Sequence, residues 1–103
     1  MRDRPKMKSK IEIWRNNANM GHTAIVYFKK GHKYLYISLT HSKRVNGVST
    51  LPLDKNPNPL DGSVAYFIPT PLTEHKREFR IKLEDWKISK SDLKKLKPYM
   101  KTK

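Results

Sequence analysis

The segment 39–44, Leu-Thr-His-Ser-Lys-Arg, holds the densest set of side chains that could do chemistry. In an extended chain Thr40 and Ser42 share one face and His41 and Lys43 the other, and a bulge would bring them together. Hydroxyls beside a cation suit phosphate binding, and histidine suits proton transfer at neutral pH. A hydroxyl without a positioned base is no nucleophile. We therefore expect Thr40 and Ser42 to hold a phosphate or a transition state, with capping of a strand end as the alternative.

Four histidines occur in the chain, and two of them stand beside predicted strands. His22 immediately precedes an apolar run and His41 ends the next one, which are edge positions where barrel folds keep functional groups. A surface or structural role is the alternative for both. His32 falls in a predicted turn and His75 in a polar link, so we expect these two to be simply exposed.

Metal-dependent and thiol chemistry find little support in the composition. The chain has no cysteine, which excludes disulfides, thiolate nucleophiles and sulfur-ligated zinc. Asp54 and Asp61 bracket one loop, a placement that fits turn formation better than metal ligation. Glycine-rich phosphate loops, GxSxG and HExxH are absent from the sequence. We expect no metal and no cofactor.

Short strands must position these residues. Alternating or β-branched and aromatic runs predict strands at 10–14, 23–28, 33–39, 64–68 and 79–83. Leu35, Ile37 and Leu39 share one face of the third strand, so that face should be the core. Residues 69–76, which contain two prolines, are expected to form an irregular link.

The turns between the strands have clear signals. Residues 29–32 predict one hairpin turn, and Asn46-Gly47 supplies the two positive-φ positions of another. The strand continuing past residue 40 is therefore expected to return through 48–53. Prolines alternating with asparagines keep 54–62 free of regular structure.

The last segment changes its hydrophobic period. Ser89 and Asp92 fit a capping box, Ile88 and Leu93 fit a hydrophobic staple, and Pro98 should end or kink the helix that follows. About six strands before one short helix predict a mainly β (α+β) fold, a small antiparallel barrel or strongly curved sheet closed by the helix. We expect a single domain over 1–103, with a flexible basic arm at 1–9, the barrel at 10–88 and a basic helix and tail at 89–103.

The net charge of +14 is concentrated at the two ends of the chain. Residues 1–10 carry five basic groups and one acid, and residues 76–103 carry eleven basic groups and four acids, which leaves only +3 for 11–75. A basic edge on an ordinary core indicates a polyanionic partner, with nucleic acid ahead of membrane lipid. A charge excess that only solubilises the protein is the alternative.

Aromatic side chains interleaved with cations could also stack unpaired bases, although most of the aromatic residues should pack in the core. The expected RNA-binding residues are Lys33, Tyr34, Tyr36, Arg44, Lys87, Lys90, Lys94 and Lys97. The apolar stretches are too short to span a bilayer and the N-terminus is unlike a secretory signal. We expect a cytoplasmic protein that does not contact a membrane.

The segment 21–43 resembles the start of small barrel toxins of toxin–antitoxin systems, the MazF/Kid/PemK endoribonucleases and the ToxN/AbiQ toxins. In these families a basic residue precedes an apolar-Ile-Val strand, a hairpin returns, and the next strand ends in Leu/Ile-Thr-Ser followed by Lys. Here His22 stands at the basic position, residues 39–43 at the Thr-Ser-Lys site, and residues 63–68 are similar to a later barrel strand. The chain departs from the pattern where His41 is inserted between Thr and Ser, and where a histidine replaces Arg or Lys.

The resemblance implies an SH3-like, MazF-like barrel that cleaves single-stranded RNA without metal, through the neighbouring 2′-hydroxyl, and leaves a cyclic phosphate. His22 or His41 would move protons, and Lys43 with Arg44 would stabilise the phosphorane. The expected catalytic residues are His22, Thr40, His41, Ser42 and Lys43. An antitoxin, either RNA or an acidic protein, would neutralise the toxin, in a homodimer or a toxin–antitoxin hetero-oligomer.

Two alternatives stay open. The first is a non-enzymatic nucleic-acid-binding protein, ribosome-associated or encoded by a phage or mobile element, that uses the basic ends for affinity. The second is a basic partner for an acidic protein.

Overall fold

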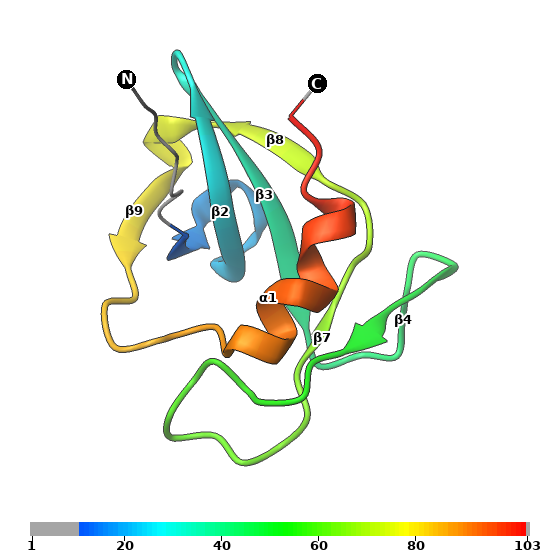
Figure 1. Ribbon diagram of the computed structural model, residues 1–103. Coiled ribbons are helices and arrows are strands. Elements are labelled where there is room, and N and C mark those ends of the chain that lie inside the picture. The colour runs from blue at the N-terminus through cyan, green and yellow to red at the C-terminus, as the bar shows by residue number, and fades with distance from the viewer. Residues whose placement is uncertain (1–10, 103) are drawn as a thin grey trace, which may run out of the picture.

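A computed structural model describes residues 11–102, so the basic arm expected at 1–9 lies outside the described residues. The main sheet has seven antiparallel strands, and a small hairpin and one helix complete the fold (Figure 1). The strands are β1 (Glu12–Asn16), β2 (His22–Lys30), β3 (Lys33–Thr40), β4 (Arg44–Val45), β5 (Val48–Ser49), β6 (Leu51–Pro52), β7 (Tyr66–Phe67), β8 (Leu72–His75) and β9 (Phe79–Lys82). The helix is α1 (Lys90–Leu96), and short 3-10 turns are η1 (Asn17–Asn19), η2 (Lys76–Glu78) and η3 (Lys97–Tyr99). The mainly β fold with a C-terminal helix is confirmed.

The strand order is β6-β7-β3-β2-β1-β9, and β8 pairs with β3 on the same edge as β7. β3 is long enough to hold both, because β8 pairs with residues 33–36 and β7 with residues 39–40. η2 joins β8 directly to β9, which lies at the opposite edge of the sheet. No pairing between β8 and β9 occurs in the part of the chain that the structure describes, so the sheet is open and a closed barrel is not found.

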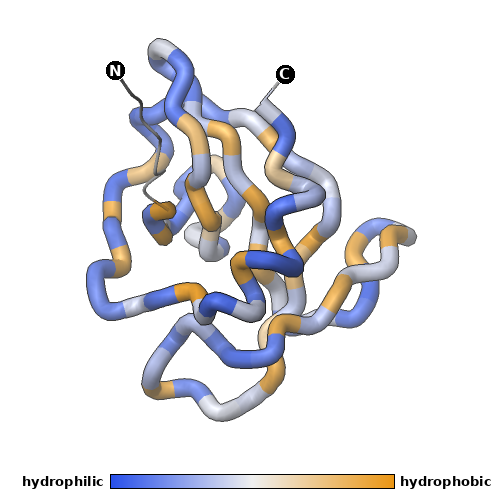
Figure 2. The backbone as a smooth tube through the Cα atoms, in the orientation of Figure 1, coloured by the Kyte–Doolittle hydropathy of each residue, from blue (hydrophilic) through white to orange (hydrophobic). Residues whose placement is uncertain are grey.

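The core lies on both faces of the two central strands. Leu35, Ile37 and Leu39 are buried on one face, where Leu96 of α1 covers them, which confirms the predicted core face. The opposite face is also buried, around Tyr36 and Phe79. Figure 2 shows the hydrophobic colouring along the middle of β2 and β3 and the hydrophilic colouring at the turn that joins them.

Two strand predictions were wrong. The strand does not continue past Thr40 into the Asn46-Gly47 hairpin, because residues 41–43 are irregular and β4 and β5 pair only with each other. The turn itself forms as predicted, with φ of 51° at Asn46 and 79° at Gly47. Residues 72–75 form β8 and are not an irregular link, because the free edge of β3 supplies their hydrogen-bond partners once Pro71 is passed.

The C-terminal helix holds the long loop in place. The Ser89 side chain caps α1 by accepting a hydrogen bond from the Asp92 backbone N–H at 3.2 Å, and the α-helix ends before Pro98. The fully buried Asp92 carboxylate accepts from the backbone N–H groups of Asp54 at 2.6 Å and Lys55 at 3.0 Å. Asp92, in the first turn of the helix, therefore also fixes the start of the irregular loop 54–62.

Candidate active site

A cavity of about 230 Å³ opens where β2 begins and β3 ends. Its walls come from the β1–β2 connection, the strand ends, the loop 54–62 and the link between β9 and α1. The antiparallel register pairs Ala24 with Ser38, so His22 at the start of β2 lies beside the end of β3. His22, Thr40 and His41 all line the cavity, and three of the five expected catalytic residues are thus brought together.

Arg15, near the end of β1, adds a cation to this cavity, and the β1–β2 connection positions it. The Asn16 side chain accepts from the Ala18 N–H at 3.1 Å, and Met20 and Gly21 take positive φ values of 54° and 78°. The Arg15 guanidinium donates to the Gly21 carbonyl at 3.2 Å and lines the cavity. Arg15 keeps further donors of its planar group for an anionic ligand.

A histidine and a carboxylate face each other in the cavity wall. The His41 Nε2 lies 3.3 Å from Asp61 Oδ2, and the other Asp61 oxygen accepts from the Ser63 N–H at 2.9 Å and the Ser63 hydroxyl at 2.7 Å. The bonds from Ser63, followed by that from His41, lower the pKa of Asp61 to about 2. Asp61 is therefore an anion near neutral pH, and the His41 side chain beside it is 73% exposed and open to a ligand.

The chain turns away from the cavity directly after His41. The Thr40 hydroxyl oxygen accepts from the Ser42 N–H at 3.1 Å, which leaves its own O–H free to donate. The carbonyl groups of Ser42 and Lys43 accept from the Thr50 hydroxyl at 2.7 Å and the Thr50 N–H at 3.0 Å. Ser42 and Lys43 are exposed and do not line the cavity.

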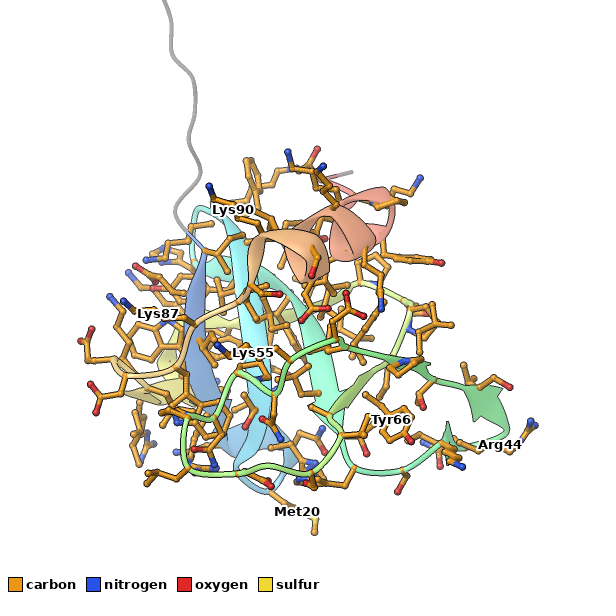
Figure 3. The ribbon with its side chains drawn as sticks, turned by 60° about the horizontal axis from the view of Figure 1, so that its bottom comes forward. Met20, Arg44, Lys55, Tyr66, Lys87 and Lys90 are labelled. Carbon is orange, nitrogen blue, oxygen red and sulfur yellow. The ribbon has the colours of Figure 1, made fainter. Side chains whose placement is uncertain are left out.

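Arg44 lies beyond this point on the projecting hairpin, at the edge of Figure 3. Its guanidinium donates to the Gly47 carbonyl at 2.7 Å and to the Ser49 hydroxyl at 3.2 Å. These bonds hold Arg44 against its own turn, and it is not among the cavity residues. The structure therefore does not bring Lys43 or Arg44, the expected stabilisers of a phosphorane, into the cavity with His22 and His41.

The sequence did not predict Arg15, Trp86 or Asp61 as site residues, and Asn58 was missed as well. Arg15 lies near the end of β1 and Trp86 lies in the link before α1, and neither has a local motif that indicates a site. Asp61 was assigned to turn formation, which its bonds to Ser63 bear out, but its second oxygen faces His41. Only the spacing of Arg15 and His22 around a short connection gave a signal that the two could meet.

The two tyrosines expected to stack bases already pack against other side chains of the protein. Tyr36 is 5% exposed, its ring packs edge-on against Phe79 and its hydroxyl accepts from Asn16 Nδ2 at 3.0 Å. Burial leaves Tyr36 no ring face for a base. Tyr34 is half-buried, stacks on Phe79 at 5.1 Å and has the Lys29 ammonium 5.0 Å from its ring centroid. Lys33 is exposed at the far end of β3 from the cavity.

The four C-terminal lysines expected to bind RNA are exposed, and the first of them follows the cavity wall: Lys87, Lys90, Lys94 and Lys97. Lys87 directly follows Trp86, and its N–H donates to the Pro57 carbonyl at 3.3 Å. Figure 3 shows Lys55, Lys87 and Lys90 on the face that carries the loop and the start of α1. Within residues 11–102 no ion pair involves Lys87, Lys90, Lys94 or Lys97. Among the described residues these four cations therefore have no carboxylate partner.

Within residues 11–102 no group of three or more histidine, aspartate or glutamate side chains could hold a metal ion. No helix in that same range has the length and apolar character needed to cross a membrane. No protein-family model matches the sequence, and neither a curated protein nor a solved structure is significantly similar to it. The function must therefore be argued from the cavity and its surroundings.

Proposed function

We propose that the protein is a metal-independent endoribonuclease that cleaves single-stranded RNA and serves as the toxin of a toxin–antitoxin system. The observation that carries the proposal is the meeting of His22, Thr40 and His41 in one cavity, which Arg15 and Asp61 complete. Two imidazoles, a hydroxyl and a guanidinium are the groups that an internal phosphoryl transfer from a 2′-hydroxyl needs. They move two protons and stabilise the charge on the phosphate.

In the proposed reaction His41 takes the proton of the ribose 2′-hydroxyl, whose oxygen attacks the adjacent phosphorus. Asp61, 3.3 Å from His41, stabilises the imidazolium that forms. Arg15 and the Thr40 hydroxyl bind the non-bridging phosphate oxygens as their charge grows. His22 donates a proton to the departing 5′-oxygen, and the products are a 2′,3′-cyclic phosphate and a free 5′-hydroxyl.

The finer fold assignment is part of the same proposal. The strand path β8-β3-β2-β1-β9, with its two outer strands joined by the three residues of η2, supports an open relative of an SH3-like, MazF-like barrel. The proposed site of action is the cytoplasm, and the proposed partners are RNA and an antitoxin that is either RNA or an acidic protein.

A non-enzymatic nucleic-acid-binding protein is the second candidate. It is favoured by the exposed cations that follow Trp86, which would bind phosphates whether or not the cavity reacts. This candidate predicts binding that is sensitive to salt and insensitive to substitution of the cavity histidines.

Induction of the gene in bacterial cells tests the proposed function. We expect wild-type protein to arrest growth and to fragment cellular RNA, and the His41→Ala variant to do neither at equal protein levels. His32→Ala is the matched control, because His32 is exposed in the turn at the opposite end of β3 and should leave both effects intact. Arrest without RNA fragmentation, or arrest by the His41→Ala variant, would contradict the proposal.

A further inference from the structure

Trp86 places an indole ring in the cavity wall, which contains no phenylalanine, tyrosine or other tryptophan among the described residues. Its link is held by hydrogen bonds from the Leu83 N–H to the Ile13 carbonyl at 2.8 Å and from the Trp86 N–H to the Leu83 carbonyl at 3.2 Å. In the described part of the chain, Trp86 takes part in no aromatic pair and its indole N–H has no hydrogen-bond acceptor. Its backbone is thus fixed while its ring is half-buried and lines the cavity.

An amide donor lies in the same cavity. The Asn58 Oδ1 accepts from the Leu60 N–H at 3.0 Å, and its Nδ2 has no acceptor among residues 11–102. The neighbouring Asn56 differs, because its Oδ1 accepts from the Asn58 N–H at 2.9 Å and its Nδ2 donates to the Ser63 carbonyl at 3.0 Å. Asn56 therefore builds the loop, whereas Asn58 has donors left for a ligand.

We infer that Trp86 and Asn58 form a subsite for one unpaired nucleobase beside the phosphate groups of the proposed reaction. The inference rests on the proposed function and names the part of the substrate that the cavity recognises. The indole offers a stacking face and the Asn58 amide a donor for the acceptor edge of a base, while Arg15 and Thr40 take the phosphate. A base in a duplex has both faces of its ring stacked on neighbouring bases, so it cannot stack on the indole. The subsite therefore selects single strands.

Fluorescence of two single-tryptophan variants tests the subsite. Trp14→Phe leaves Trp86 as the reporter, and Trp86→Phe leaves Trp14, which lies outside the cavity lining. The probes are a 2′-O-methyl uridine hexamer, which has no 2′-hydroxyl to react, and an abasic hexamer with the same phosphates. We expect the uridine hexamer to quench Trp86 emission and to leave Trp14 emission unchanged, and the abasic hexamer to quench neither.

Affinities measured by anisotropy of a labelled hexamer give an independent readout. We expect Trp86→Ala to weaken binding of the uridine hexamer about tenfold and to leave binding of the abasic hexamer unchanged. Asn58→Ala, at a half-buried loop position, should weaken the same binding several-fold, with Asn17→Ala as the exposed control. Equal affinities of wild-type protein for the two hexamers would overturn the subsite.

The two proposals fail separately in these experiments. Quenching and base-dependent affinity in a protein that cleaves no RNA would support the subsite and contradict the nuclease. Cleavage of RNA, without any change of Trp86 emission on addition of the uridine hexamer, would support the nuclease and overturn the subsite.

Discussion

At the scale of single residues, the His41–Asp61 pair distinguishes this cavity from a simple phosphate-binding site. We expect Asp61→Asn to lower the rate of RNA cleavage about tenfold with little change in KM, because the anion that stabilises the imidazolium is lost while the phosphate ligands stay. Single-turnover cleavage measures the effect. Asp54→Asn is the matched control, since Asp54 pairs with Lys95 at 2.9 Å and does not line the cavity. Equal cleavage rates for the two variants would show that Asp61 takes no part in the reaction.

The low pKa of Asp61 also makes a prediction about stability. Its pKa is about 2 in the folded protein against 3.8 ordinarily, so the unfolded chain takes up the proton first as the pH falls. The stabilisation is complete above about pH 4 and is lost as the pH falls toward 2. Urea unfolding at pH 5 and pH 2.5 should therefore show a smaller loss of stability in Asp61→Asn than in wild-type protein. An identical loss of stability in both proteins would contradict a lowered pKa of Asp61 in the folded protein.

At the scale of elements, α1 and the loop 54–62 should be energetically coupled through Asp92. The buried carboxylate accepts from the Asp54 and Lys55 N–H groups and from the Ser89 hydroxyl. Asn in place of Asp92 retains one acceptor oxygen, so we expect a loss of about 2 kcal/mol in the free energy of unfolding. Chemical denaturation measures this, and Asp85→Asn, at an exposed position, is the control that should change little.

The strands that carry the cavity histidines could be predicted because the signals are local. β2 and β3 have apolar content and a glycine turn between them, and the strand ends identify His22 and His41. β8 was missed because its four residues form a strand only by pairing with the distant β3 edge. Asp61 was missed as a site residue for the same reason, because its partner His41 is 20 residues away. Contacts set by tertiary pairing leave no periodic pattern in the sequence.

For the molecule as a whole, the exposed lysines should govern the salt dependence of RNA binding, and the cavity residues should govern the rate of cleavage. We expect Lys90→Gln with Lys94→Gln to reduce the slope of log affinity against log salt by about 1.4 for single-stranded RNA, from about 0.7 for each lost phosphate contact. The cleavage rate at saturating RNA should not change. The control pair is Lys30→Gln with Lys76→Gln, at the end of the sheet that carries the β2–β3 turn. A larger effect of the control pair would show that RNA binds at the β2–β3 turn end of the sheet and would contradict the prediction.

Cleavage of one RNA and of its 2′-O-methyl counterpart in excess EDTA tests the central claim most directly. We expect wild-type protein and His32→Ala to cut the RNA, to leave 2′,3′-cyclic phosphate ends and to spare the 2′-O-methyl strand. The rate should be at least about 100-fold lower for His41→Ala, which is the usual contribution of a general base. Cleavage of the 2′-O-methyl strand, loss of all cleavage in EDTA, or equal rates for His41→Ala and His32→Ala would contradict the proposed mechanism.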